Sequence, residues 1–181
     1  MNLKSLMPGS VEKPLRALHR AHVLRTALGQ FDRRMGGTDP IPMQLVADLI
    51  YGWGNEGWSA KPELLSYVLE EFRSFRGTAL ECGSGVSTLL LTTIARRTGA
   101  RLISLEHDSR WFEFIRERSR KLGLPGGGLV HAPLKNFGGH TWYDTDERLP
   151  NDAGFDLVLC DSPPESTNGG RYGLLPRIND G

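Results

Sequence analysis

The sequence predicts an α/β fold, in which a parallel β-sheet carries helices on both faces and is preceded by amino-terminal helices. From Gly77 onward, short apolar runs alternate with longer segments of helical periodicity, which is typical of parallel sheets with helical crossovers. Before Gly77, helical patterns follow one another without an intervening strand. We therefore expect a helical segment with a loop over residues 1–57 and an α/β domain over residues 58–181.

The first region is expected to contain two helices. Apolar residues recur at helical spacing between Val11 and Asp32, and basic residues fill the opposite face of this helix. Glycines and prolines over residues 36–42 then break the pattern. Residues 43–51 predict a second, short helix, and a glycine-tryptophan loop over residues 52–58 completes the region.

The second region begins with a helix and continues with alternating strands and helices. Ser59 is a candidate cap for the helix, Pro62 suits its first turn, and the helix is expected to end near Phe75. The remaining elements are expected in this order: strand 78–82, helix 87–98, strand 101–105, helix 109–122, and strands 128–132 and 155–160.

The composition excludes several classes of protein but does not identify a binding partner. The 181 residues suffice for one domain with a substantial core, and the formal net charge is +1. No segment resembles a signal peptide or a membrane span, so no membrane partner is expected. Cys82 and Cys160 stand at strand ends, which predicts neither a disulfide framework nor a metal site and favours a reducing cytoplasm.

The amino-terminal 35 residues are distinctly basic. Their basic residues are Lys4, Lys13, Arg16, Arg20, Arg25, Arg33 and Arg34, against the acidic Glu12 and Asp32. Such an arm can contact RNA or an anionic surface, but a solvated helix face explains the same charges. No aromatic residues are interleaved with the charges, so a nucleic acid is not the expected partner.

A glycine turn between a strand and a helix gives the strongest functional signal. Gly83 and Gly85 allow close backbone approach to a ligand, and the helix that follows directs unpaired N–H groups at it. A dinucleotide fingerprint needs a third glycine where this chain has Thr88. The carboxylate of Glu81 would repel a pyrophosphate but attract a cation, and Glu106 ends the next strand, where a carboxylate can hold a ribose diol.

These features resemble the first motif of the class I S-adenosylmethionine-dependent methyltransferases, an acidic residue followed by Gly-x-Gly after one intervening residue. Here the motif is Glu81, Cys82, Gly83, Ser84 and Gly85, and the resemblance extends from about Trp58 to about Pro176. It implies a Rossmann-like sheet with strand order 3-2-1-4-5-7-6 and S-adenosylmethionine as the cofactor. Only the first four strands are recognisable, so the resemblance implies that the carboxyl-terminal strands are missing. The fourth strand would then form an open apolar edge, which favours a homodimer.

The resemblance also implies roles for individual residues. Asp161 would be catalytic, as a proton acceptor beside the reacting methyl group, and would also line the cofactor site. The expected cofactor-binding residues are Glu81, Gly83, Ser84, Gly85, Glu106, His107, Ala132 and Asp161, and no metal ligand is expected. Asp108 is either an adenine neighbour or the cap of the next helix, and both interpretations stay open.

Other residues permit a functional and a structural interpretation side by side. Four aromatic residues could form a lid over the site or belong to the core: Trp53, Trp58, Trp142 and Tyr143. His140 could accept a proton or simply be exposed in its loop. A metal at Asp161 would need acidic partners that the sequence does not supply.

The expected function is methyl transfer to an oxygen or nitrogen of a small molecule. Methyl transfer from a sulfonium is an in-line displacement with a good leaving group, so the enzyme mainly has to align the nucleophile, the methyl group and the sulfur and to exclude water. Two alternatives stay open. One is a nucleic-acid or protein methyltransferase that uses the basic arm, and the other is a non-catalytic module that binds S-adenosylmethionine.

Overall fold

The computed structural model describes residues 9–55, 57, 59–124, 126, 128–145, 149 and 154–179. The chain forms two compact units, Met1–Glu70 and Glu71–Gly181, which we describe separately. No helix within the described residues is both long and apolar enough to cross a membrane.

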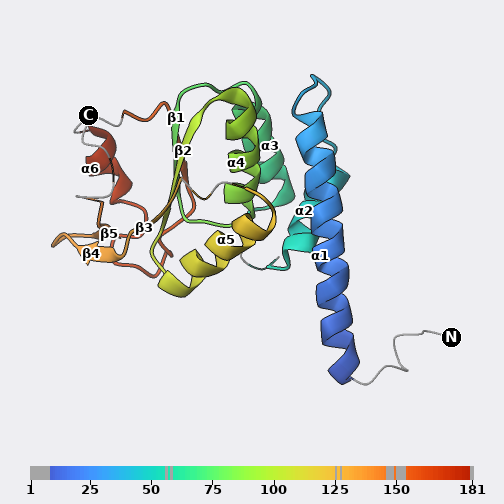
Figure 1. Cartoon of the computed structure of the whole chain (residues 1–181). Coiled ribbons are helices and arrows are strands. Elements are labelled where there is room, and N and C mark those ends of the chain that lie inside the picture. The colour runs from blue at the N-terminus through green and yellow to red at the C-terminus, as the bar shows by residue number, and fades with distance from the viewer. Residues whose placement is uncertain are drawn as a thin grey trace. The chain divides into compact units, whose positions relative to one another are not determined.

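The first unit is built from helices, as the sequence predicts. α1 (Gly9–Arg34) and α2 (Met43–Trp53) pack side by side (Figure 1), and α3 (Pro62–Arg73) begins in this unit. The two helices approach closely at Gly52, where a Cβ atom would lie 2.6 Å from the backbone nitrogen of Leu24. Ser59 is not the cap of α3, because the helix begins at Pro62 and Lys61 directly precedes it; the Ser59 hydroxyl donates to Asn55 O instead. α3 ends at Arg73, short of the expected Phe75.

The second unit contains a four-stranded parallel sheet, which confirms the α/β class. Its strands are β1 (Thr78–Cys82), β2 (Arg101–Glu106), β3 (Leu129–His131) and β6 (Leu157–Cys160), in the order β3-β2-β1-β6. This is the neighbour order that the resemblance implies for the first four strands, and it is compatible with a Rossmann-like fold. β6 lies at an edge of the sheet, as expected, and pairing of this edge with a second copy stays a prediction.

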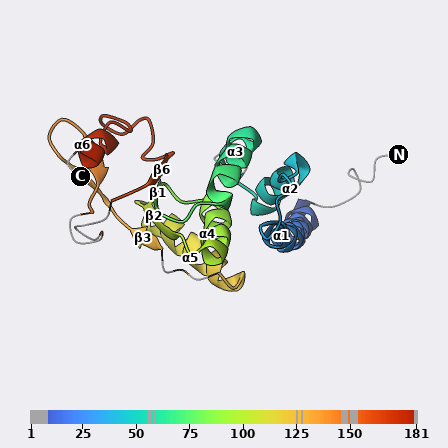
Figure 2. The ribbon, with the colours of Figure 1, turned by 90° about the horizontal axis from the view of Figure 1, so that it is seen from above.

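Two helices cover one face of this sheet. α4 (Val86–Thr98) follows β1, and α5 (Ser109–Lys121) follows β2. Figures 1 and 2 show both helices on the same side of the strands, as right-handed crossovers between strands added in one direction require. Gly99 ends α4 in the left-handed conformation.

The opposite face is covered differently from the expectation of helices on both faces. A short antiparallel hairpin, β4 (Leu134–Asn136) with β5 (Thr141–Tyr143), lies on this side together with the six-residue helix α6 (Leu174–Asn179) (Figure 2). The sequence analysis missed this hairpin. The core between sheet and hairpin includes Leu80, Cys82, Ile103, Leu105, Ala132, Trp142 and Tyr143.

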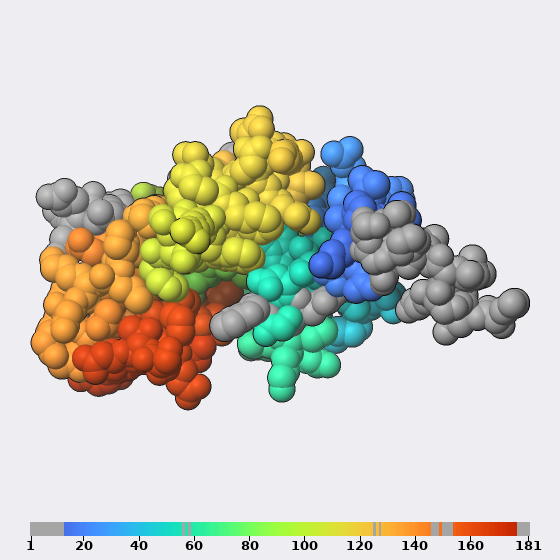
Figure 3. All heavy atoms as spheres, turned by 90° about the horizontal axis from the view of Figure 1, so that it is seen from below, coloured from blue at the N-terminus to red at the C-terminus, as the bar shows by residue number. Residues whose placement is uncertain are grey.

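The segment after β6 packs against the same hairpin. Thr141 N donates to Asn168 O at 2.8 Å, and a Cβ at Gly173 would lie 2.7 Å from the Trp142 side chain. In Figure 3 the orange atoms of the hairpin and the red atoms of this segment lie side by side on one face. The hairpin therefore supports the loop that follows β6, which carries Asp161.

Candidate functional site

The strand order places a topological switch point between β1 and β6. The chain passes from β1 through α4 to β2 on one side, whereas β6 adds on the other side of β1. In open α/β sheets, ligands bind outside the carboxyl ends of the strands at such a point. The glycine turn after β1 and the Asp161–Ser162 segment after β6 both lie there, because the backbone nitrogens of Asp161 and Ser162 donate to Cys82 O at 3.0 and 2.9 Å.

The turn requires glycine at its first position. Gly83 has a φ of 97°, and a Cβ there would lie 2.5 Å from Cβ of Ser162. Its nitrogen donates to Leu105 O at 2.9 Å, which ties the turn to β2. At Gly85, by contrast, an added Cβ would meet its nearest atom, Ser87 Oγ, only at 4.0 Å, so the backbone is open to an approaching group there.

Strand register brings the two predicted carboxylates to one face of the sheet. Glu81 of β1 pairs with Ser104 of β2, and Glu106 lies two residues further along β2. Since side chains alternate along a strand, all three project to the same side. Thr88 of α4 contacts Glu81, so this side is the one that α4 covers.

The Glu81 carboxylate is fully buried and only half of it is hydrogen bonded. Oε2 accepts from Thr88 Oγ1 at 2.7 Å and from Ser104 Oγ at 2.6 Å. Oε1 is buried and has no hydrogen-bond partner among the residues that the structure describes. Burial raises the pKa of Glu81, and the charge of Glu106 acts in the same direction, whereas the hydroxyls of Ser104, Ser87 and Thr88 lower it.

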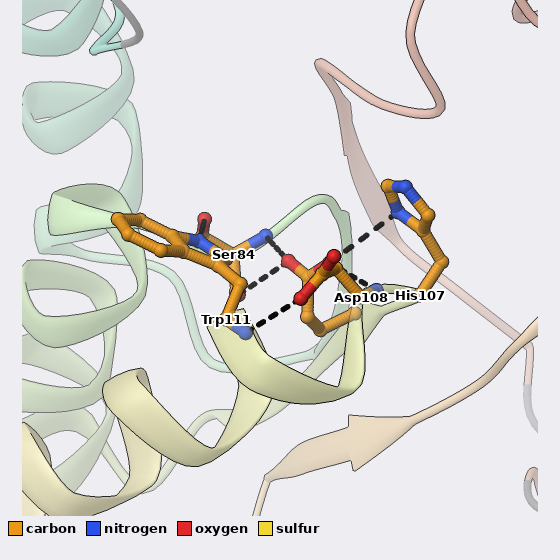
Figure 4. A network of polar contacts seen from close by, with 5 residues as sticks. Ser84, His107, Asp108 and Trp111 are labelled. Atoms are coloured by element: carbon orange, nitrogen blue, oxygen red, sulfur yellow. Dashed lines mark hydrogen bonds and ion pairs between the residues drawn. The ribbon is translucent and has the colours of Figure 1, made fainter.

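Glu106 is the centre of a second network (Figure 4). Its Oε2 accepts from Ser84 N at 3.2 Å and from Ser84 Oγ at 2.7 Å, and its Oε1 accepts from Asp108 N at 2.9 Å. His107 Nδ1 lies 3.3 Å from the same Oε1. The carboxylate thus joins the glycine turn to the segment after β2.

Trp111 extends this network to α5. Asp108 caps α5 by accepting from Trp111 N at 2.7 Å, which confirms the cap interpretation, while a contact of Asp108 with adenine stays a prediction. The indole Nε1 of Trp111 donates to Ser84 O at 2.9 Å (Figure 4). Ser84 is therefore held from both sides, by Glu106 and by Trp111.

Asp161 lies at the switch point beside a cation. Its carboxylate is 63% exposed, and Arg171 Nη2 lies 3.2 Å from Oδ1 and donates to the Asp161 carbonyl at 2.7 Å. Arg171 therefore fixes both the backbone and the side chain of Asp161. The carboxylate keeps access to solvent.

The structure brings most of the predicted site residues together, with one exception. The turn residues, Glu81, Glu106 and His107 surround the carboxyl ends of β1 and β2, and Asp161 follows the neighbouring β6. Ala132 is fully buried in the core, with its nitrogen bonded to Glu106 O at 2.8 Å, so its side chain offers no surface to a ligand.

The remaining aromatic candidates belong to the core rather than to a lid. Trp53, Trp142 and Tyr143 are 4%, 2% and 0% exposed. Trp58 lies outside the described residues. His140 is half-buried, with its ring stacked on Phe137 and edge-on to Tyr172.

The two cysteines are free thiols that face each other across the sheet. Cys82 and Cys160 are register partners of β1 and β6. The hydrogen bond between the two groups raises the pKa of the Cys82 thiol and lowers that of Cys160. Across the described parts of the chain, no group of three or more histidine, cysteine or acidic residues is placed to hold a metal ion.

Three contributors to the site were missed by the sequence analysis. Thr88 counted only as a missing glycine, whereas its hydroxyl also accepts from Gly85 N at 2.9 Å. Ser104 is a single polar residue inside an apolar strand, which is a usable signal once the register is known. Trp111 sits three residues after a capping aspartate, but nothing in this spacing indicates the bond to Ser84.

Comparison of the chain with protein-family models, with curated proteins and with solved structures finds no match.

Proposed function

We propose that this protein is an S-adenosylmethionine-dependent methyltransferase of the class I type that acts on an oxygen or nitrogen of a small molecule. One observation carries the proposal. Two buried carboxylates, Glu81 and Glu106, project from the ends of adjacent parallel strands onto the same sheet face, beside a glycine turn that opens a helix. This arrangement suits a ligand with a positive charge and a ribose but no pyrophosphate.

The unpartnered oxygen of Glu81 fits the ammonium group of such a ligand. A buried carboxylate oxygen without a donor is costly, and an ammonium group supplies that donor together with an opposite charge. Because Oε1 is shielded from solvent, the ammonium would reach it through a water or after a shift of the turn. A diphosphate at the same place would meet two carboxylates and be repelled.

Glu106 fits a ribose diol if it exchanges partners. Its Oε2 already accepts two donors from Ser84, and a hydroxyl of the ligand would replace the Ser84 hydroxyl. His107 is 27% exposed beside Oε1 and would border the same ribose. Gly83, Ser84 and Gly85 would then lie under the ligand as the backbone cradle, with the amino terminus of α4 facing it.

When bound, the cofactor supplies an activated methyl group on a sulfonium. The residues of this chain align the acceptor and receive its proton. Asp161 would take that proton at its carboxylate, and Arg171 would hold Asp161 in place through the two contacts to Nη2. The proposal also places the enzyme in a reducing cytoplasm, since Cys82 and Cys160 are free thiols in adjacent strands.

Titration calorimetry with S-adenosylmethionine, S-adenosylhomocysteine and NAD tests the cofactor. We expect both adenosyl ligands to bind and NAD to give no heat. Glu106→Ala should weaken binding about 10- to 100-fold, because one charged hydrogen bond is worth about 1.5–3 kcal/mol. Glu113→Ala is the matched control, since Glu113 is an exposed carboxylate on α5 paired with Arg116.

Binding of NAD without binding of either adenosyl ligand would refute the proposal. For the reaction itself, transfer of labelled methyl groups to a panel of small phenols, carboxylic acids and amines identifies the acceptor class. Binding of the cofactor with no transfer to any member, or transfer only to nucleic acid or protein, would replace the small-molecule assignment by one of the alternatives.

A further inference from the structure

We infer that Thr88 and Ser104 are positioning residues, which hold the Glu81 carboxylate by Oε2 so that Oε1 is reserved for the ammonium group of the ligand. The inference rests on the proposed function for the identity of the ligand. It assigns a separate role to each oxygen of the Glu81 carboxylate. It also names two residues that act through Glu81 without contacting the ligand.

The number of hydrogen bonds that each carboxylate oxygen can accept supports these separate roles. A carboxylate oxygen has two lone-pair sites, and Oε2 fills both with the hydroxyls of Thr88 and Ser104, at 2.7 and 2.6 Å. The two donors come from different elements, α4 and β2, so they fix the orientation of the carboxylate plane. Oε1 has no hydrogen-bond partner among the described residues, although the Ser87 hydroxyl also acts on this carboxylate and lowers its pKa.

Thr88 also couples the carboxylate to the glycine turn. Its single hydroxyl proton goes to Glu81, so the oxygen can only accept from elsewhere, and it accepts from Gly85 N at 2.9 Å. One side chain therefore sets the position of the acidic residue and of the second motif glycine. Ser104 has no such second contact among the bonds that the structure gives for it, which makes it the cleaner residue to test.

A purely structural role does not account for the arrangement. If Glu81 only braced α4 against β2, a neutral residue would do so without the cost of a buried acid, and burial does raise the pKa of Glu81. The charged and titratable groups that face it are Glu106 on β2 and, beyond Glu106, His107. No lysine or arginine is among these groups, whereas an ammonium ligand would bring a charge opposite to that of the Glu81 carboxylate.

The test compares two ligands on matched variants. The ligands are S-adenosylhomocysteine and its analogue without the α-amino group, and the readout is the loss of affinity caused by removing that amino group. We expect about a 10- to 100-fold loss in the wild type. In Ser104→Ala and Thr88→Val the loss should shrink to a few-fold, because Glu81 is no longer held for the amino group, and Thr88→Ser should restore the wild-type ratio.

Thr93→Val is the matched control. Thr93 is buried in the same helix, but its hydroxyl donates to Leu89 O within α4, so its removal should leave the ratio unchanged. The ratio separates positioning from general damage to the fold, since misfolding weakens both ligands alike. Should Thr88→Val not fold because Gly85 loses its partner, Ser104→Ala and Thr88→Ser still give the comparison.

The outcomes separate the two proposals. If neither adenosyl ligand binds the wild type, the proposed function fails. Both adenosyl ligands can instead bind while the amino group contributes nothing to affinity, or contributes equally in the wild type and in Ser104→Ala. Either result overturns the positioning inference, whereas the cofactor assignment stands.

Discussion

Replacing Gly83 by alanine should destabilise the protein for two separable reasons. An L-residue held in a left-handed conformation costs about 1–2 kcal/mol, and the φ of 97° at Gly83 imposes that cost on alanine. In addition, the new Cβ would lie 2.5 Å from Cβ of Ser162, so the loop after β6 must shift. Such overpacking costs about 1–3 kcal/mol, which gives about 2–5 kcal/mol in total.

Gly99→Ala isolates the first of these terms. Gly99 has a φ of 76° at the end of α4, and nothing lies within 4 Å of an added Cβ. We expect Gly99→Ala to cost about 1–2 kcal/mol from conformation alone. Urea unfolding of the wild type and both variants, followed by tryptophan fluorescence, measures the difference of about 1–3 kcal/mol that belongs to the contact with Ser162.

Equal destabilisation by the two substitutions would refute this reasoning. It would mean that the loop after β6 gives way at no cost, and that the close approach of the turn to Ser162 is not a constraint. Under the proposed function, Gly83→Ala should also weaken S-adenosylhomocysteine binding, whereas Gly99→Ala, at the far end of α4, should not.

Three further predictions concern the carboxylates. Because the pKa of Glu81 is raised in the folded protein, the free energy of unfolding is greatest below the pKa that Glu81 has in the unfolded chain, and it falls as pH rises through the folded value. Glu81→Gln should remove this fall, which amounts to at most about 1.4 kcal/mol per pH unit. Wild-type and Glu81→Gln stabilities that change in parallel between pH 4 and 8 would contradict this prediction. Ser84→Ala should tighten S-adenosylhomocysteine binding by up to about tenfold in calorimetry, because it frees Glu106 Oε2 for the ligand, and weaker binding would instead indicate a direct contact of Ser84. Asp161→Asn should lower kcat about 100-fold or more with little change in cofactor affinity, which steady-state kinetics and calorimetry together measure.

The order and type of the main elements could be predicted because local pattern and chain topology agree. The strands around Leu80 and Ile103 are nearly continuous apolar runs, and their helices carry one apolar face. Right-handed crossovers then restrict the sheet to few orders. Strand ends were less predictable, since β6 begins at Leu157 rather than at residue 155, where the apolar run starts.

The hairpin on the second face escaped the sequence analysis because its strands are only three residues long. A signal was present: Gly138 and Gly139 stand between two segments that suit short strands, and a glycine pair there predicts a tight connection. Gly138 has a φ of 88°, and its nitrogen donates to Asn136 Oδ1 at 2.8 Å. A hydrophobic periodicity that is judged over longer windows does not detect strands of three residues.

The acidic residues of the site could be predicted from their place at strand ends, but their environments could not. That Glu81 and Glu106 share a face depends on the register of β1 against β2, since a shift of one residue would send them to opposite sides. The same register puts Ser104 opposite Glu81, and it turns a serine in an apolar strand into a hydrogen-bond donor. Sequence spacing gives positions along a strand, whereas the partner across the sheet appears only with the register.

Two hydrogen-bond networks hold the glycine turn from opposite sides. Thr88 holds Gly85 and Glu81 from the α4 side, while Glu106 and Trp111 hold Ser84 from the β2 and α5 side. Both oxygens of Glu106 that the proposed cofactor would use are therefore already bonded to the chain, whereas Oε1 of Glu81 is not. Binding at Glu106 replaces the hydrogen bond from the Ser84 hydroxyl, which offsets part of its contribution, whereas binding at Glu81 supplies a missing partner. We therefore expect the amino group to contribute more to affinity than the ribose hydroxyls, an order that the deamino analogue and a 2′,3′-dideoxy analogue of S-adenosylhomocysteine measure directly.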